Sequence, residues 1–72
     1  MKPDWSHLVY VSREKVGRDW HTTLKGFASV SEAEEYGRYY DENWYVYFPK
    51  VLRIWEEHGQ VFLTMRVADS CD

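Results

Sequence analysis

The sequence predicts an α+β fold of order ββαββ, an antiparallel sheet with one helix packed on one face. Four stretches rich in β-branched and aromatic residues surround one central segment whose apolar residues recur at helical spacing. Short connections that contain glycine join these stretches in pairs. Each pair therefore predicts a hairpin, one before the helix and one after it.

The first hairpin is expected from the N-terminal third of the chain. Residues 7–12 are β-rich and predict the first strand, whereas the charged segment 13–18 predicts its connection. Residues 19–27 alternate in polarity and predict the second strand, with Gly26 marking a bulge or the end of that strand. The alternation places three residues on one face, Trp20, Thr22 and Leu24.

The central helix is predicted from about residue 31 to about residue 42, within the uncertainty of such boundaries. Two serine–glutamate pairs at capping-box spacing precede it, Ser29 with Glu32 and Ser31 with Glu34. Either pair would satisfy free amides of the first turn, and acidic residues there suit the helix dipole. The expected inner stripe is Ala33, Tyr36, Gly37, Tyr40 and Trp44.

Two features near this helix predict details of its packing. Gly37 costs about 1 kcal/mol relative to alanine in a helix interior, so its place on the inner stripe predicts a close approach to the sheet. Residues 44–48 either extend the helix or form an extended segment, and the second is preferred because Asn43 suits a helix C-cap. Pro49 then lies at an edge or a break.

Residues 50–57 and 60–67 predict the second hairpin, closed by His58 and Gly59. The tail from 68 to 72 is expected to fray. In the last strand one face carries Val61, Leu63, Met65 and Val67, and the other carries Phe62, Thr64 and Arg66.

The length of 72 residues predicts a single domain over residues 1–72. A chain of this size buries only about 60% of the surface that its unfolded form exposes. It nevertheless carries four tryptophans, six tyrosines and three phenylalanines. Some of these rings are therefore expected on the surface, where they favour partner binding.

The sequence predicts that the chain is no enzyme and holds no cofactor or metal. It contains no nucleotide-binding or nucleophile-elbow motif, and its one cysteine, Cys71, lies near the C-terminus. The three histidines are scattered, without metal-ligand spacing. So short a chain is also expected to have no room for a substrate pocket of several hundred Å³. With no signal peptide and no apolar run of membrane-spanning length, a cytoplasmic protein without membrane contact is expected.

Acidic charge is concentrated on the predicted helix. Residues 29–45 contain five acidic residues and one arginine, a net −4, whereas the whole chain is −3. This pattern predicts a docking face for a basic partner, with charge steering the encounter and one tyrosine as anchor. The alternative is an ordinary solvated face with Glu34 and Arg38 paired. The residues expected to bind the partner are Glu32, Glu35, Tyr39 and Glu42.

A rival surface lies on the sheet face away from Leu52, Ile54, Leu63 and Met65. Aromatic residues interleaved with arginines predict stacking on single-stranded nucleic acid, and the residues concerned are Arg53, Trp55, Phe62 and Arg66, which Lys25 could join. The net charge of −3 and pI of about 5.5 have the wrong sign for a phosphate binder. We therefore prefer a plain cross-strand pair of Trp55 and Phe62.

In its small size and in the acidic, aromatic-bearing helix over residues 32–44, the chain resembles the small accessory proteins of phages and mobile elements, such as anti-CRISPR proteins and phage inhibitors of host enzymes. The resemblance implies a non-catalytic inhibitor that blocks a host protein or nucleoprotein complex inside the bacterial cell. It carries over no functional residue. Alternative functions are a nucleic-acid-binding module and a homodimeric structural protein whose surplus aromatics form the interface.

Overall fold

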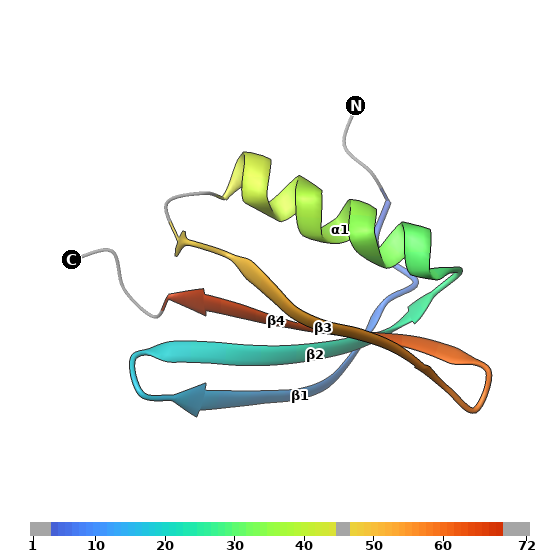
Figure 1. Ribbon diagram of the computed structural model, residues 1–72, viewed down its shortest axis with the longest axis horizontal. Helices are drawn as coiled ribbons and strands as arrows, with labels where there is room; N and C mark the ends of the chain where they lie inside the picture. Colours follow the sequence, from blue (N-terminus) through green and yellow to red (C-terminus); the bar gives the residue numbers. More distant parts are fainter. Residues whose placement is uncertain (1–3, 45–46, 69–72) are drawn as a thin grey trace.

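The computed structural model describes residues 4–44 and 47–68, and it confirms the α+β fold. Four strands form one sheet in the order β1-β2-β4-β3, and each neighbouring pair is antiparallel. The single helix lies across one face of this sheet (Figure 1). The elements in chain order are β1 (Val9–Val16), β2 (Asp19–Phe27), α1 (Val30–Asn43), β3 (Lys50–Glu57) and β4 (Gln60–Ala68).

The first hairpin is longer than the sequence predicted. Residues 13–16, expected in the connection, belong to β1 and pair with Thr22 back to Asp19 of β2. Only Gly17 and Arg18 remain in the turn. The prediction of a turn over residues 13–16 is wrong because β1 is an edge strand. Its charged side chains stay in contact with water while its backbone pairs on one side.

The helix begins as its capping signal predicted. Ser29 is the N-cap, and its Oγ accepts a hydrogen bond from the Glu32 amide at 3.1 Å. The Glu32 carboxylate reaches back to the Ala28 amide at 2.9 Å, one residue earlier than in a standard capping box. At the other end Trp44, rather than Asn43, is the C-cap, and its amide donates to the Tyr40 carbonyl.

The segment between α1 and β3 is described only in part. The helix stops at Asn43, so it does not continue through Tyr47 and Phe48, of which Phe48 has a positive φ of 50°. The extended segment expected over residues 44–48 is not found at its described positions, since the Tyr47 amide donates to the Trp44 carbonyl at 3.0 Å in a tight turn; residues 45–46 lie outside the described residues. The side chains of Trp44 and Phe48 are exposed, which agrees with the expectation that the core cannot hold every ring.

The core lies between the helix and the middle of the sheet. Central strand β4 alternates as predicted, because its odd-numbered residues face the helix and its even-numbered residues face away. Among the described residues, the helix packs mainly on β3 and β4 and less on β2. The buried hydrophobic residues are Leu24, Phe27, Ala33, Tyr36, Val61, Leu63 and Met65.

Register shifts interrupt the sheet at three places, between Tyr10 and Ser12 of β1, at Gly26 of β2 and at Leu52 of β3. At Gly26, φ is +105°, and the register between β2 and β4 shifts there, so the predicted bulge is present. A Cβ on Gly26 would lie 2.8 Å from the His7 carbonyl oxygen, which explains why glycine occupies the site. The shift at Leu52 in β3 leaves that side chain 42% exposed. The prediction that Leu52 shares the core face with Ile54 is therefore wrong, since the bulge turns it out of the alternation.

No helix among residues 4–44 and 47–68 is long and apolar enough to cross a membrane.

The helix backbone approaches the sheet most closely at Gly37, as its place on the inner stripe predicted. A Cβ at this position would lie 2.5 Å from Cγ2 of Val51. We expect Gly37→Ala to lower the free energy of unfolding by about 1 kcal/mol, because overpacking of about 1–3 kcal/mol exceeds the helix-propensity gain of about 1 kcal/mol. Urea denaturation measures the change, and in a Val51→Ala background the same substitution should become neutral or stabilising. A more stable Gly37→Ala protein with Val51 intact would contradict this explanation.

Candidate functional site

Strand β1 is exposed along its whole length. All eight of its residues are exposed, among them Val9 at 51%, Tyr10 at 68% and Val11 at 49%. The helix packs toward the opposite edge of the sheet, so it does not cover this strand. An edge strand of this kind carries backbone groups that point away from β2, its neighbour among the described strands.

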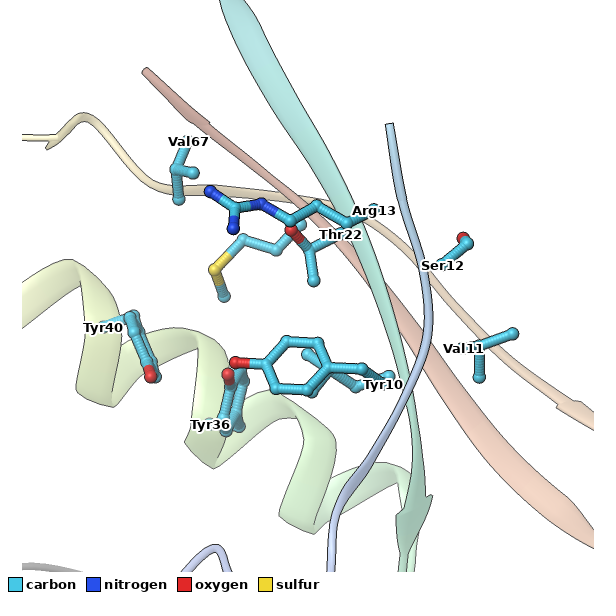
Figure 2. A pocket seen from close by; sticks show the side chains of 10 residues that line it. Tyr10, Val11, Ser12, Arg13, Thr22, Tyr36, Tyr40 and Val67 are labelled. Atoms are coloured by element: carbon cyan, nitrogen blue, oxygen red, sulfur yellow. The ribbon is translucent and has the colours of Figure 1, made fainter. Parts of the chain in front are cut away.

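A groove of about 600 Å³ runs between β1 and the helix. Figure 2 shows the Tyr10 side chain extending from β1 toward Tyr36 and Tyr40 of α1, with Arg13 beside it. The sequence predicts that the chain cannot enclose a pocket of several hundred Å³, and this space is an open groove. It exists because the off-centre helix leaves part of its own sheet face uncovered. The groove is lined by Tyr10, Val11, Ser12 and Arg13 of β1, Thr22 and Leu24 of β2, Tyr36 and Tyr40 of α1, and Met65 and Val67 of β4.

The tyrosines on the helix side of the groove are held in the ring packing of α1. Tyr36 is buried, with its ring 4.7 Å from that of Tyr40 and 5.5 Å from that of Phe27. Burial raises the pKa of the Tyr36 hydroxyl far above its usual range, and the neighbouring Tyr40 hydroxyl adds to the rise. Tyr36 therefore stays neutral near neutral pH, where it can act as a hydrogen-bonding wall but not as a base.

Two positively charged side chains of β1, Arg13 and Lys15, lie over the Trp20 ring of β2. The Arg13 guanidinium carbon lies 4.4 Å from the centre of the Trp20 ring, and the Lys15 ammonium lies 5.7 Å from it. Such cation–π contacts contribute about 0.5–1 kcal/mol at exposed sites, and they hold both cations over the helix side of the hairpin. The described lining residues include no carboxylate, histidine or cysteine, so this part of the groove is apolar and basic.

The acidic helix face is smaller than the sequence predicted. Glu35 and Glu42 are exposed, with Arg38 between them. Tyr39, the expected anchor, is half-buried, because its ring packs edge-on against Trp5 at 6.2 Å and against Tyr40 at 5.7 Å. The helical periodicity of the sequence does not predict this contact, because Trp5 belongs to an N-terminal segment for which no strand or helix is predicted.

Glu32 has structural partners of its own. Its Oε1 accepts from the Ala28 amide and lies 2.9 Å from Nε2 of His7. The His7 ring and the Ala28 amide lower the pKa of this carboxyl. Glu32 therefore fastens the N-terminal segment to the start of the helix. Of the predicted docking residues, only Glu35 and Glu42 present unpartnered charge among the contacts described, and binding by this face stays a prediction.

The residues proposed to bind nucleic acid lie together on the open sheet face, but their aromatic rings already contact other side chains of this chain. Trp55 stacks on Phe62 with centroids 5.0 Å apart and an interplanar angle of 8°. The guanidinium carbon of Arg53 lies over the same indole, 4.5 Å from the ring centre. Nε of Arg66 lies 3.7 Å from Oδ2 of Asp19. A base needs a free ring face on which to stack. The Trp55 ring already has two neighbours packed against it, which favours the plain cross-strand cluster.

Sequence reasoning missed the groove. The available signal was the run Val9-Tyr10-Val11, which places apolar side chains on both faces of the first strand. The cations that follow it, Arg13 and Lys15, were assigned to a turn. Read as strand residues, they would have indicated a basic edge.

No cluster of three or more metal-ligating side chains occurs in the part of the chain that the structure describes. Comparison of the chain with models of protein families, with curated proteins and with solved structures finds no match. The assignment of function therefore depends on the surfaces described above.

The Glu32 contacts predict a pH-dependent contribution to stability. Because the pKa of folded Glu32 is lowered, its contribution is fully present above the ordinary value of 4.5 and is lost as the pH falls through the lower folded-state pKa. Urea titrations should therefore show that Glu32→Gln destabilises the protein at about pH 7 and much less at about pH 3. Glu35→Gln, on the exposed face of the same helix, is the matched control and should change little. A Glu32→Gln effect of equal size at both pH values would contradict this role.

Proposed function

We propose that this chain is a non-enzymatic protein-binding module and that β1 with the adjoining groove is its binding surface. The observation that carries the proposal is the pairing of an edge strand exposed along its full length with an apolar groove of about 600 Å³ beside it. Peptide-binding domains that extend a sheet use the same two parts. The strand edge supplies main-chain hydrogen bonds, and the pocket selects side chains.

The chemistry of the groove supports binding rather than catalysis. Its described lining residues offer phenol and alcohol hydroxyls, one guanidinium and apolar carbon, and among them there is no pair of groups suited to acid–base or nucleophilic steps. Its volume lies within the range of ligand sites, about 300–1,000 Å³. One wall, however, is the exposed Tyr10 at a free strand edge. This geometry fits an extended polypeptide better than an enclosed small molecule.

Inhibition of a host protein or nucleoprotein complex, which the sequence suggested, would be one use of such a module. The groove supports the protein-binding part of that suggestion through apolar contact at Tyr10 and Tyr40. The acidic pair Glu35 and Glu42 would be a second contact point on the helix. A nucleic-acid partner receives less support, because the rings of the open sheet face cover one another.

The test is selection of ligands from a random peptide library displayed on phage, panned against the chain. Tyr10→Ser combined with Val11→Ser removes apolar contact area at two exposed positions, so the fold should survive, and circular dichroism checks this. Enriched peptides should bind the double variant at least about tenfold more weakly, since about 1.4 kcal/mol corresponds to a factor of ten.

The matched control reverses charge on the helix, with Glu35→Lys and Glu42→Lys together. Peptides that use the groove should bind this variant as they bind the original chain. Enrichment of peptides that bind the Tyr10 and Val11 variant unchanged, or no enrichment at all, would remove the groove as the binding surface. Loss of binding in the helix variant alone would transfer the function to the acidic face.

A further inference from the structure

We propose that the occupant of the β1 edge is an extended acidic segment of another protein, which adds to the sheet as a fifth strand with its carboxylates facing Arg13 and Lys15. This inference rests on the proposed function and deepens it by naming the chemistry of the partner. It follows from the way β1 distributes charge between its two faces, from the failure of self-pairing, and from the position of the groove.

The register places the cations of β1 on the groove side. Tyr10, Arg13 and Lys15 pair with Leu24, Thr22 and Trp20, which share the helix face of β2. Ser12, Glu14 and Val16 pair with residues of the open face. A strand laid against β1 would therefore present every second side chain to two cations and a tyrosine.

Opposite charges on directly facing residues of neighbouring strands contribute about 0.2–1 kcal/mol per pair, whereas like charges destabilise the pair. Among the described residues that line the groove, Arg13 is the one with a charged side chain. A carboxylate on the incoming strand would therefore meet the positive charge of Arg13. Basic side chains at the same positions would be repelled.

A second copy of this chain fits the edge poorly. In a dimer whose two β1 strands pair antiparallel about a twofold axis, both sheets carry their helices on the same side. Each residue of β1 must therefore lie opposite a residue from the same side of the sheet. An axis at Arg13 places that arginine against itself, and an axis at Lys15 does the same for the lysine. An axis at Glu14 opposes two glutamates and also places Arg13 against Lys15. Each of these three registers, the ones that pair three or more of residues 12–16, thus brings like charges together.

The groove adds a requirement for an apolar side chain. Tyr10 lies beyond Arg13 along β1, past the bulge between Tyr10 and Ser12, and it faces the space above Leu24 and Met65. A large apolar side chain two or three residues from the carboxylates would enter this space. The expected ligand therefore has two acidic residues spaced by one, followed by an aromatic or aliphatic anchor.

The other sheet edge differs in each of these respects. Strand β3 is packed under the helix, and Val51 and Ile54 on its helix face are partly buried against the core. Among the described residues, the groove beside it is bordered by Glu34 and Asp41 as well as Arg38. An acidic strand should therefore prefer β1 to β3.

The experiment uses two synthetic peptides that differ only in charge. The first is Thr-Phe-Val-Asp-Val-Asp-Val-Phe-Thr, whose palindromic order serves either strand direction, and the second has lysine in place of both aspartates. Fluorescence anisotropy at low ionic strength measures their affinities, and amide chemical shifts locate the site. The acidic peptide should bind at least about tenfold more tightly than the basic one and shift the amides of β1, because surface charge pairs are least screened there.

The charge-reversed variant Arg13→Glu with Lys15→Glu should invert this preference. The matched control, Lys50→Glu with Arg53→Glu on β3, makes the same change in net charge and should leave the preference intact. A version of the acidic peptide with N-methyl groups on alternate amides, which cannot pair as a strand, should lose binding about tenfold or more.

Several results would overturn the inference. These are equal affinity for both peptides, an unchanged preference in the Arg13 and Lys15 variant, undiminished binding of the N-methylated peptide, or shifts confined to α1 or β3. A dimer through β1 at high concentration, seen by analytical ultracentrifugation, would also overturn it. The proposed function is decided separately, because peptides selected by panning that need Tyr10 but carry no acidic residue would leave it standing.

Discussion

The width of one helix set against the width of a four-stranded sheet is the constraint on which the rest of this structure depends. A helix with its side chains is about 10–12 Å across, whereas neighbouring strands lie about 4.8 Å apart. A single helix therefore covers two or three strands and leaves at least one uncovered. In this chain α1 packs toward β3 and β4, so the uncovered strand is β1. The groove and the exposed edge both follow from that lateral offset.

The offset has a packing cause in the close approach of the helix to β3. Gly37 lets the helix backbone come down onto Val51, and Ala33 is fully buried in the same interface. On the opposite side of the helix the buried ring of Tyr36 holds the backbone farther from β1 and β2. The small Gly37 on one flank of the helix and the large Tyr36 on another therefore place the helix closer to β3 than to β1.

Contacts between aromatic rings add stability to the small hydrophobic core. Trp5 packs edge-on against Tyr36 at 5.1 Å, and Tyr36 in turn contacts Phe27 and Tyr40. Aromatic pairs of this kind contribute about 0.5–1.5 kcal/mol beyond their buried area. Their packing has a cost, since Nε1 of Trp5 is buried without a hydrogen-bond partner among the described residues. Two of these rings, Tyr36 and Tyr40, also line the groove, so residues that stabilise the fold shape its candidate binding surface as well.

Sequence periodicity predicted the elements well, since the alternation of β4, the serine cap at Ser29 and the role of Gly37 depend on local pattern. It could not predict the lateral position of the helix, which depends on how far apart two surfaces are held by Gly37 and Tyr36. For that reason the groove was missed, and Tyr39 was expected on an open face that Trp5 partly covers. The charged half of β1 was taken for a turn because solvated edge strands lack a hydrophobic face.

Amide hydrogen exchange, followed residue by residue by NMR, tests the central claim most directly. If the helix leaves β1 uncovered, amides of β4 should be the most protected, and alternate amides of β1, those that point away from β2, should exchange nearly as fast as in an unfolded chain. Uniform protection along β1, equal to that of β4, would show that this edge is covered and would contradict the proposed binding surface.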